Sequence, residues 1–161
     1  MAGGAPLHIH GTCIALGARA VLLRGPSGSG KSDLAFRLIR GDASGETRLV
    51  ADDQVALEER GGRLLARAPA ALAGLLELRG LGLVAVPAIA EAPLALIVDL
   101  VPRDAVPRLP EARYEALREV RLPVLALDAF DGTAPLKLRL ALETLPESGF
   151  PGDDGRFGPG V

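Results

Sequence analysis

Gly25-Pro26-Ser27-Gly28-Ser29-Gly30-Lys31-Ser32 matches G-x-x-x-x-G-K-[ST], the pattern of a phosphate-binding loop. It lies between a short apolar run at 20–23 and a stretch with helical spacing at 33–40, which is the strand–loop–helix context that the pattern needs. Glycines let backbone N–H groups surround phosphate oxygens, the lysine reaches the β- and γ-phosphates, and the serine hydroxyl ligates Mg²⁺. The sequence therefore predicts a site for ATP and Mg²⁺.

Length favours a single domain, which the strand–loop–helix context places in the α/β class. The chain has 161 residues, which suits one hydrophobic core, and we expect the domain to span 1–145. Residues 146–161 are rich in glycine and proline and are predicted to form a disordered tail. A net charge of −2 gives no long-range attraction for polyanions, so nucleic acid and membrane surfaces are not expected as partners.

One cysteine, Cys13, excludes an internal disulfide framework and suits a reducing compartment, and its expected role is that of a small buried apolar residue. The first residues show no basic region followed by an apolar segment. These features predict a cytoplasmic protein.

Apolar periodicity predicts a mixed sheet with an antiparallel pair of strands leading into the phosphate loop. The expected strands are 7–16, 20–23, 48–51, 55–58, 64–66, 72–78, 83–86, 94–101 and 124–127, and the expected helices are 33–40 and 134–145. In the second helix, Leu136, Leu140 and the Ala141/Leu145 pair are spaced as one face of a helix.

Asp52 and Asp53 close a strand about twenty residues after the phosphate loop, where nucleotide-binding proteins often place a second acidic motif. Successive strand residues face opposite ways, so only one of the two can enter the site unless the strand has already turned. We favour Asp52 as the general base toward a hydroxyl, with Asp53 as its support or as a metal contact. The alternative is a pair of turn carboxylates that cap local N–H groups.

Glu77 and Arg79 lie two apart in an expected strand and would share one face, as a Mg²⁺ ligand beside a phosphate clamp. A surface ion pair is the alternative. His10 lies on the strand before the phosphate loop, and a hairpin could return it to the site. The alternative is a packed, hydrogen-bonded histidine, which would give the same sequence pattern. The isolated acid Asp99 is interpreted as a loop or cap residue, and Arg139 is expected on the solvated face of the last helix.

Four segments in this order resemble the catalytic domain of the bacterial HPr kinase/phosphorylase family. They are HG at His10-Gly11, the phosphate loop, LVADD at 49–53 and LELRGLG at 76–82. The last of these is similar to the signature of the family and is more specific than the phosphate loop. The short chain resembles the single-domain members of alphaproteobacteria.

The resemblance implies a P-loop fold related to phosphoenolpyruvate carboxykinase and a kinase that phosphorylates a serine of HPr or an HPr-like phosphocarrier protein of a phosphotransferase system. It implies a homo-oligomer, often a hexamer. By matching motifs, the loop 25–32 would hold the ATP phosphates, Ser32 and Glu77 would bind Mg²⁺, and Asp52 would take the serine proton. Asp53, Arg79 and His10 would complete the site.

Two alternatives to a protein kinase stay open: a small-molecule kinase on the same scaffold, and a nucleotide-sensing module that transfers no phosphate. The later P-G-R-N-like motif of the family is not evident around Arg121 to Val124, so the reverse reaction, phosphorolysis of the phosphoserine, also stays open.

Overall fold

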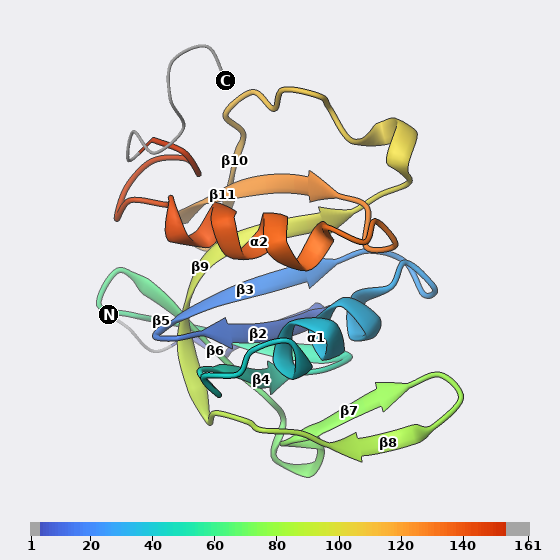
Figure 1. Ribbon diagram of the computed structural model, residues 1–161. Coiled ribbons are helices and arrows are strands. Elements are labelled where there is room, and N and C mark those ends of the chain that lie inside the picture. The colour runs from blue at the N-terminus through green and yellow to red at the C-terminus, as the bar shows by residue number, and fades with distance from the viewer. Residues whose placement is uncertain (1–3, 154–161) are drawn as a thin grey trace.

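The computed structural model describes residues 4–153, which form a curled mixed sheet covered by two α-helices (Figure 1). In that range the α-helices are α1 (Lys31–Arg40) and α2 (Ala134–Glu143), with short 3₁₀ turns at Ala70–Leu72 and Arg103–Ala105. The strands are β1 (Leu7–His10), β2 (Thr12–Leu16), β3 (Arg19–Arg24), β4 (Thr47–Ala51), β5 (Gln54–Arg60), β6 (Arg63–Arg67), β7 (Leu75–Leu78), β8 (Gly82–Ala85), β9 (Glu91–Leu100), β10 (Tyr114–Leu117) and β11 (Val120–Leu127). None of the helices in this range has the length and apolar character needed to cross a bilayer.

Strand order decides where the site lies. The main sheet runs β1-β5-β6-β9-β3-β2-β4, with β11 also paired to β9 and β10 paired to β11, while β7 and β8 form a separate hairpin. Strands β3, β9 and β11 are parallel, and β4 runs the same way because β2 is antiparallel to both β3 and β4. The carboxyl ends of β4, β3, β9 and β11 therefore meet at one edge, where ligands bind in open α/β sheets.

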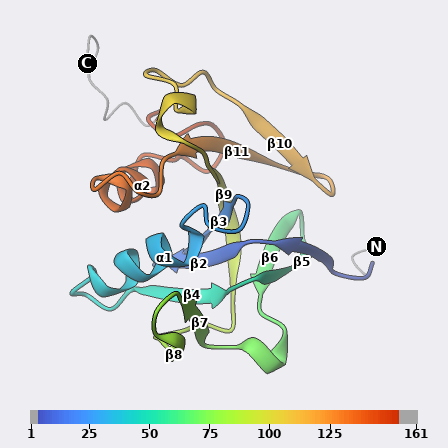
Figure 2. The same ribbon diagram turned by 90° about the vertical axis from the view of Figure 1, so that its right-hand side faces the viewer.

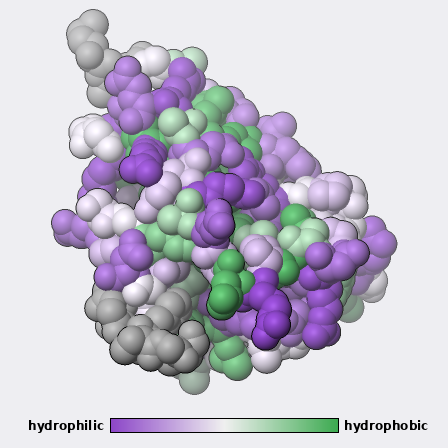
Figure 3. Space-filling model, turned by 90° about the horizontal axis from the view of Figure 1, so that it is seen from above, coloured by the Kyte–Doolittle hydropathy of each residue, from purple (hydrophilic) through white to green (hydrophobic). Residues whose placement is uncertain are grey.

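Different elements pack on the two faces of the sheet. Helices α1 and α2 lie on one side, and the β1–β5–β6 part curls over the other side (Figure 2). Alternation along β3 matches this arrangement, because Val21 and Leu23 join the core cluster under the helices, whereas Ala20 and Leu22 join the cluster on the opposite face. The face seen from above in Figure 1 is mostly hydrophilic and carries only small, separate apolar patches (Figure 3).

Several expected elements are confirmed. The antiparallel pair β2–β3 leads into the phosphate loop, α1 follows it, and β5–β6 is the predicted hairpin. Cys13 is fully buried, and burial raises the pKa of its thiol, which agrees with a structural role.

The single strand expected over 7–16 is wrong, because the chain changes partners at Gly11. Strand β1 pairs with β5, whereas β2 pairs with β3 and β4. At Gly11 the backbone lies so close to β3 that an added β-carbon would be 2.7 Å from the Leu23 carbonyl oxygen. Only glycine fits this crossing, and apolar alternation alone did not reveal it. Strand β10 was also not predicted.

The face predicted for the last helix is right in part, because Ala141 and Leu145 are 6% and 7% exposed, but it is wrong for its two leucines at 136 and 140. Leu136 and Leu140 are 67% and 45% exposed, while the buried side chains of α2 are Ala134, Leu138, Ala141 and Leu142. Both sets satisfy helical spacing, so the sequence pattern could not choose between them. In the structure, α2 is oriented so that the side chain of Leu138 lies in the core.

The first part of the expected disordered tail is packed. Phe150 is buried, its ring lies edge-on to Tyr114 at 6.1 Å, and its N–H donates to Asp153 at 2.7 Å. The buried ring and a hydrogen bond from the Gly152 N–H to the Thr144 carbonyl at 3.1 Å connect this segment to the domain despite its glycine and proline content. Residues 154–161 of the predicted tail lie outside the described residues, and the domain boundary at 145 stays a prediction.

We predict that Leu38→Ala, in the buried face of α1, lowers the free energy of unfolding by about 2–5 kcal/mol because it leaves a cavity under the helix. Leu136→Ala on the exposed side of α2 is the matched control and is expected to change stability by less than about 0.5 kcal/mol. Urea unfolding followed by circular dichroism measures both. Equal losses would mean that the assigned faces of the helices are incorrect.

Candidate active site

The phosphate loop connects the end of β3 to the first turn of α1. Gly28 and Gly30 have φ values of 85° and 92°, a conformation that side chains disfavour. An added β-carbon on Gly25 would lie 2.5 Å from the Ser29 hydroxyl oxygen, so the loop closes tightly on itself. The result is a backbone cradle at a helix N-terminus, which fits a phosphate group.

Lys31 lies across this loop. Its ammonium group donates to the carbonyl oxygens of Gly25 at 2.7 Å and Pro26 at 3.1 Å. An ammonium group has three donors, so these two bonds leave one for a ligand. The lysine therefore holds the loop in shape and places a positive charge beside the cradle.

Asp52 is the buried acid of the site, with 8% of the residue exposed. Its carboxylate accepts hydrogen bonds from the hydroxyl of Thr12 at 2.8 Å, the hydroxyl of Ser32 at 3.2 Å and the backbone N–H of Glu77 at 3.1 Å. The donors come from β2, the start of α1 and β7. Asp52 therefore lies beside the phosphate loop, and each of its oxygens already has a donor.

Asp53 points the other way, but not through strand alternation, because β4 ends at Ala51 and the chain has already turned. The chain turns at this residue with φ 69°, and the side chain is 68% exposed. The Asp53 carboxylate lies 3.3 Å from Nδ1 of His10, and the Asp53 carbonyl accepts the N–H of Gly11 at 3.1 Å. A solvent-facing acid and an imidazole thus lie together next to the buried acid.

Glu77 and Arg79 do not lie on one strand face, contrary to the sequence-based prediction. Glu77 is exposed on β7 and reaches Asp52 through its backbone N–H. The expected shared strand face is wrong for Arg79, because β7 ends at Leu78 and Arg79 lies in the turn that leads to β8. Within residues 4–153, no three His, Cys, Asp or Glu side chains are grouped as a metal site. Ser32 and Asp52 are the oxygen donors that are already adjacent, and such donors suit Mg²⁺.

The family model described as "HPr Serine kinase C-terminal domain" matches residues 5–106. The chain belongs to this family. The matched range contains the phosphate loop, both aspartates, His10, Glu77 and Arg79. The family suggested by the sequence motifs is therefore confirmed.

Relatives of this HPr kinase family domain include the HPr kinase/phosphorylases of Clostridium tetani and Clostridium acetobutylicum. Each is 40% identical over 81 residues, which is 50% of this chain and 25% of the relative. The similarity thus spans about a quarter of the length of these relatives.

The fold is also similar to that of a solved structure, the Hpr(Ser) kinase/phosphatase from Coxiella burnetii. The TM-score is 0.74 at 23% sequence identity, and the similarity covers 85% of this chain and 94% of that one. The predicted fold class, an α/β P-loop fold of the HPr kinase type with a mixed sheet, is confirmed.

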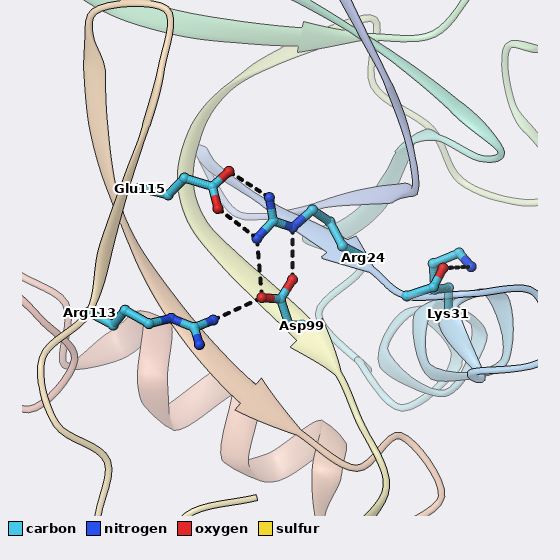
Figure 4. A network of polar contacts seen from close by, with 6 residues as sticks. Arg24, Lys31, Asp99, Arg113 and Glu115 are labelled. Atoms are coloured by element: carbon cyan, nitrogen blue, oxygen red, sulfur yellow. Dashed lines mark hydrogen bonds and ion pairs between the residues drawn. The ribbon is translucent and has the colours of Figure 1, made fainter. Parts of the chain in front are cut away.

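Next to the phosphate loop, this HPr kinase family domain carries an ion network that sequence reasoning missed (Figure 4). Arg24, the last residue of β3, donates to Asp99 at 2.7 and 3.1 Å and to Glu115 at 2.7 and 3.0 Å. Arg113 donates to the same aspartate at 2.9 Å. Hydrogen bonds to Glu115 and then Asp99 raise the pKa of Arg24, although burial opposes them. The network ties β3, β9 and β10 together at the residue where the loop begins.

Two interpretations of single residues are corrected by these contacts. Asp99 lies within β9 and is an ion-pair partner, not a loop or cap residue. Arg139 is largely buried and donates to the Thr47 hydroxyl and the Leu38 carbonyl, so it does not lie on a solvated face. Partners 75 to 101 residues away in the chain leave no local signal in the sequence.

We predict that Arg24→Gln lowers the free energy of unfolding by about 1–3 kcal/mol, since it removes four charged hydrogen bonds between three strands. Arg113→Gln, which removes one bond from a more exposed arginine, is the control and is expected to cost less than about 1 kcal/mol. Urea unfolding of both variants tests this. Similar losses would contradict a central role for Arg24.

Proposed function

We propose that this protein is an ATP-dependent protein-serine kinase whose acceptor is an HPr-like phosphocarrier protein of a phosphotransferase system. The observation that carries the proposal is the contact between Ser32, at the start of α1, and the buried carboxylate of Asp52, with the next residue, Asp53, open to solvent beside His10. A nucleotide-sensing module needs the first acid only. A kinase also needs an acid that can meet an incoming hydroxyl.

The phosphate loop supplies the binding half of this activity. Its backbone N–H groups and the ammonium group of Lys31 would neutralise phosphate charge, which is most of what phosphoryl transfer requires from a protein. Ser32 and Asp52 would hold Mg²⁺, with Glu77 nearby on β7. Bound Mg²⁺ would supply further charge neutralisation on the transferred group.

The contacts of the two aspartates favour a different division of roles from the one that the sequence suggests. Asp52 is buried and accepts hydrogen bonds from three donors, which leaves one of its roughly four acceptor sites for a metal ion, so it suits metal binding and support of the loop. Asp53 is exposed and lies beside His10, so it can approach an acceptor serine. In this proposal Asp53 takes the proton of the serine hydroxyl as the serine oxygen bonds to the γ-phosphorus, the bond from that phosphorus to the β,γ-bridging oxygen breaks and ADP leaves, while His10 positions the Asp53 carboxylate.

The acceptor and the assembly are parts of the same proposal. The clostridial relatives are named HPr kinase/phosphorylases, which supports a phosphocarrier as the acceptor. The family resemblance implies a homo-oligomer, often a hexamer, which sedimentation analysis would measure, and the single cysteine suits a cytoplasmic location. Arg79, in the exposed β7–β8 turn, is available to contact phosphate groups or the acceptor.

Incubation with γ-labelled ATP, Mg²⁺ and a purified HPr-like protein tests the function. We expect label on the acceptor, and none on an acceptor whose target serine is replaced by alanine. Label on small metabolites alone would favour the small-molecule kinase, while nucleotide binding without any turnover would favour the sensing module. Adding inorganic phosphate to the labelled acceptor then tests phosphorolysis.

We predict that Asp53→Asn lowers kcat about 10²- to 10⁴-fold with little change in ATP affinity, because it removes the proton acceptor only. Asp52→Asn is expected to weaken Mg²⁺-dependent ATP binding about 10- to 100-fold, because it removes the carboxylate beside Ser32. Steady-state kinetics and titration calorimetry separate the two effects.

Asp104→Asn, an exposed acid on the turn at Arg103–Ala105, is the matched control and should behave as the unmodified chain. Lys31→Ala should abolish transfer by removing the ammonium group from the cradle. If Asp53→Asn transfers phosphate normally while Asp52→Asn binds ATP but cannot transfer it, the base is Asp52 and the proposed division of roles is incorrect.

A further inference from the structure

The loop between β11 and α2 lies directly against the phosphate loop. A β-carbon added to Gly30 would be 2.8 Å from Cβ of Ala129 and 3.3 Å from the ring atoms Cε1 and Cζ of Phe130. Gly30 immediately precedes Lys31, so the ring edge of Phe130 lies beside the start of α1. Neither the sequence motifs nor the proposed catalytic groups account for this aromatic side chain.

Phe130 is held in place but is not covered. Arg37 of α1 donates to the carbonyl oxygens of Ala129 and, at 3.4 Å, of Asp131, which fixes the loop on both sides of the ring. The Phe130 N–H donates to the carboxylate of Asp128 at 3.0 Å. The residue is nevertheless 68% exposed, whereas Tyr114 and Phe150 pack against each other. A fixed ring with an open surface suits a planar ligand.

Strand order gives the direction in which a nucleotide would extend. The acids follow β4, the phosphate loop follows β3, and Phe130 follows β11, in the spatial order β4-β2-β3-β9-β11. A triphosphate whose γ-phosphoryl group faces the acids would extend its nucleoside across the carboxyl ends of β9 and β11. In Figure 1 the turn after β11 lies at the same end of the sheet as the loop after β3.

We propose that Phe130 is the stacking platform for the base of the bound nucleotide. This inference rests on the proposed function, because it assumes that the cradle binds a nucleoside triphosphate. Base–aromatic stacking tolerates different bases, so ATP and GTP should both use the platform. An inorganic polyphosphate has no base and should bind without it.

Phe130→Ala is the first test. We expect its Kd for Mg²⁺–ATP to rise roughly 5- to 100-fold, the range that loss of one stacked base gives, with no change in the Kd for tripolyphosphate. Titration calorimetry measures both ligands. An unchanged Kd for ATP, or an equal loss for ATP and tripolyphosphate, would overturn the proposal, the second result because it would indicate a distorted loop.

The second test uses the absence of tryptophan from the chain. Phe130→Trp introduces a unique indole, whose emission should be quenched by ATP in a saturable way and not by tripolyphosphate. Leu136→Trp, an equally exposed position on α2, is the control and should not respond to either ligand. Quenching by both ligands, or by neither, would overturn the proposal.

These outcomes separate the inference from the proposed function. ATP-specific quenching without phosphate transfer to an HPr-like protein would leave the platform in place and contradict the kinase. Transfer that survives Phe130→Ala with normal ATP affinity and a raised KM for the acceptor would contradict the platform only, because Phe130 would then contact the acceptor. Failure of both ATP and tripolyphosphate to bind the unmodified chain would contradict both.

Discussion

The site depends on the hydrogen bonds that the carboxylate of Asp52 accepts. A buried carboxylate is unfavourable unless donors satisfy it, and its three donors come from β2, the first turn of α1 and β7. Those elements are therefore positioned together. The hydroxyls of Thr12 and Ser32 can both reach Asp52 only if β4 ends at the same edge as β3, which the antiparallel strand β2 between them ensures.

The phosphate loop has a different neighbour on each side. Toward β4 lie the paired acids and His10, and toward β9 and β11 lie the Arg24 network and the loop that carries Phe130. Lys31 donates to two carbonyl oxygens of the loop and so holds it closed. Arg24, the strand residue before the loop, is fixed by its ion network. The loop is thus held by contacts within it, by the strand residue before it and by the neighbouring β11–α2 loop. Such preorganisation is how proteins stabilise developing charge in phosphoryl transfer.

Local patterns predicted the parts that depend on local chemistry. The loop 25–32, helix α1 and the hairpin β5–β6 all follow from residue spacing. Predictions were wrong where a distant partner decides. Gly11 divides one apolar strand because β3 passes too close for a side chain, α2 turns Leu138 rather than Leu136 inward, and Phe150 secures a segment whose composition is typical of disorder.

The sequence by itself determined the family and the phosphate loop, because both depend on residue types at fixed spacings within short motifs. The tertiary structure alone decided which acid is buried, which arginine joins three strands, and that an aromatic ring lies beside Gly30. Those relations join residues 20 to 100 positions apart. Their geometry is set by strand order and by the free energy of satisfying buried charges, and neither of these can be read from any single stretch of the chain.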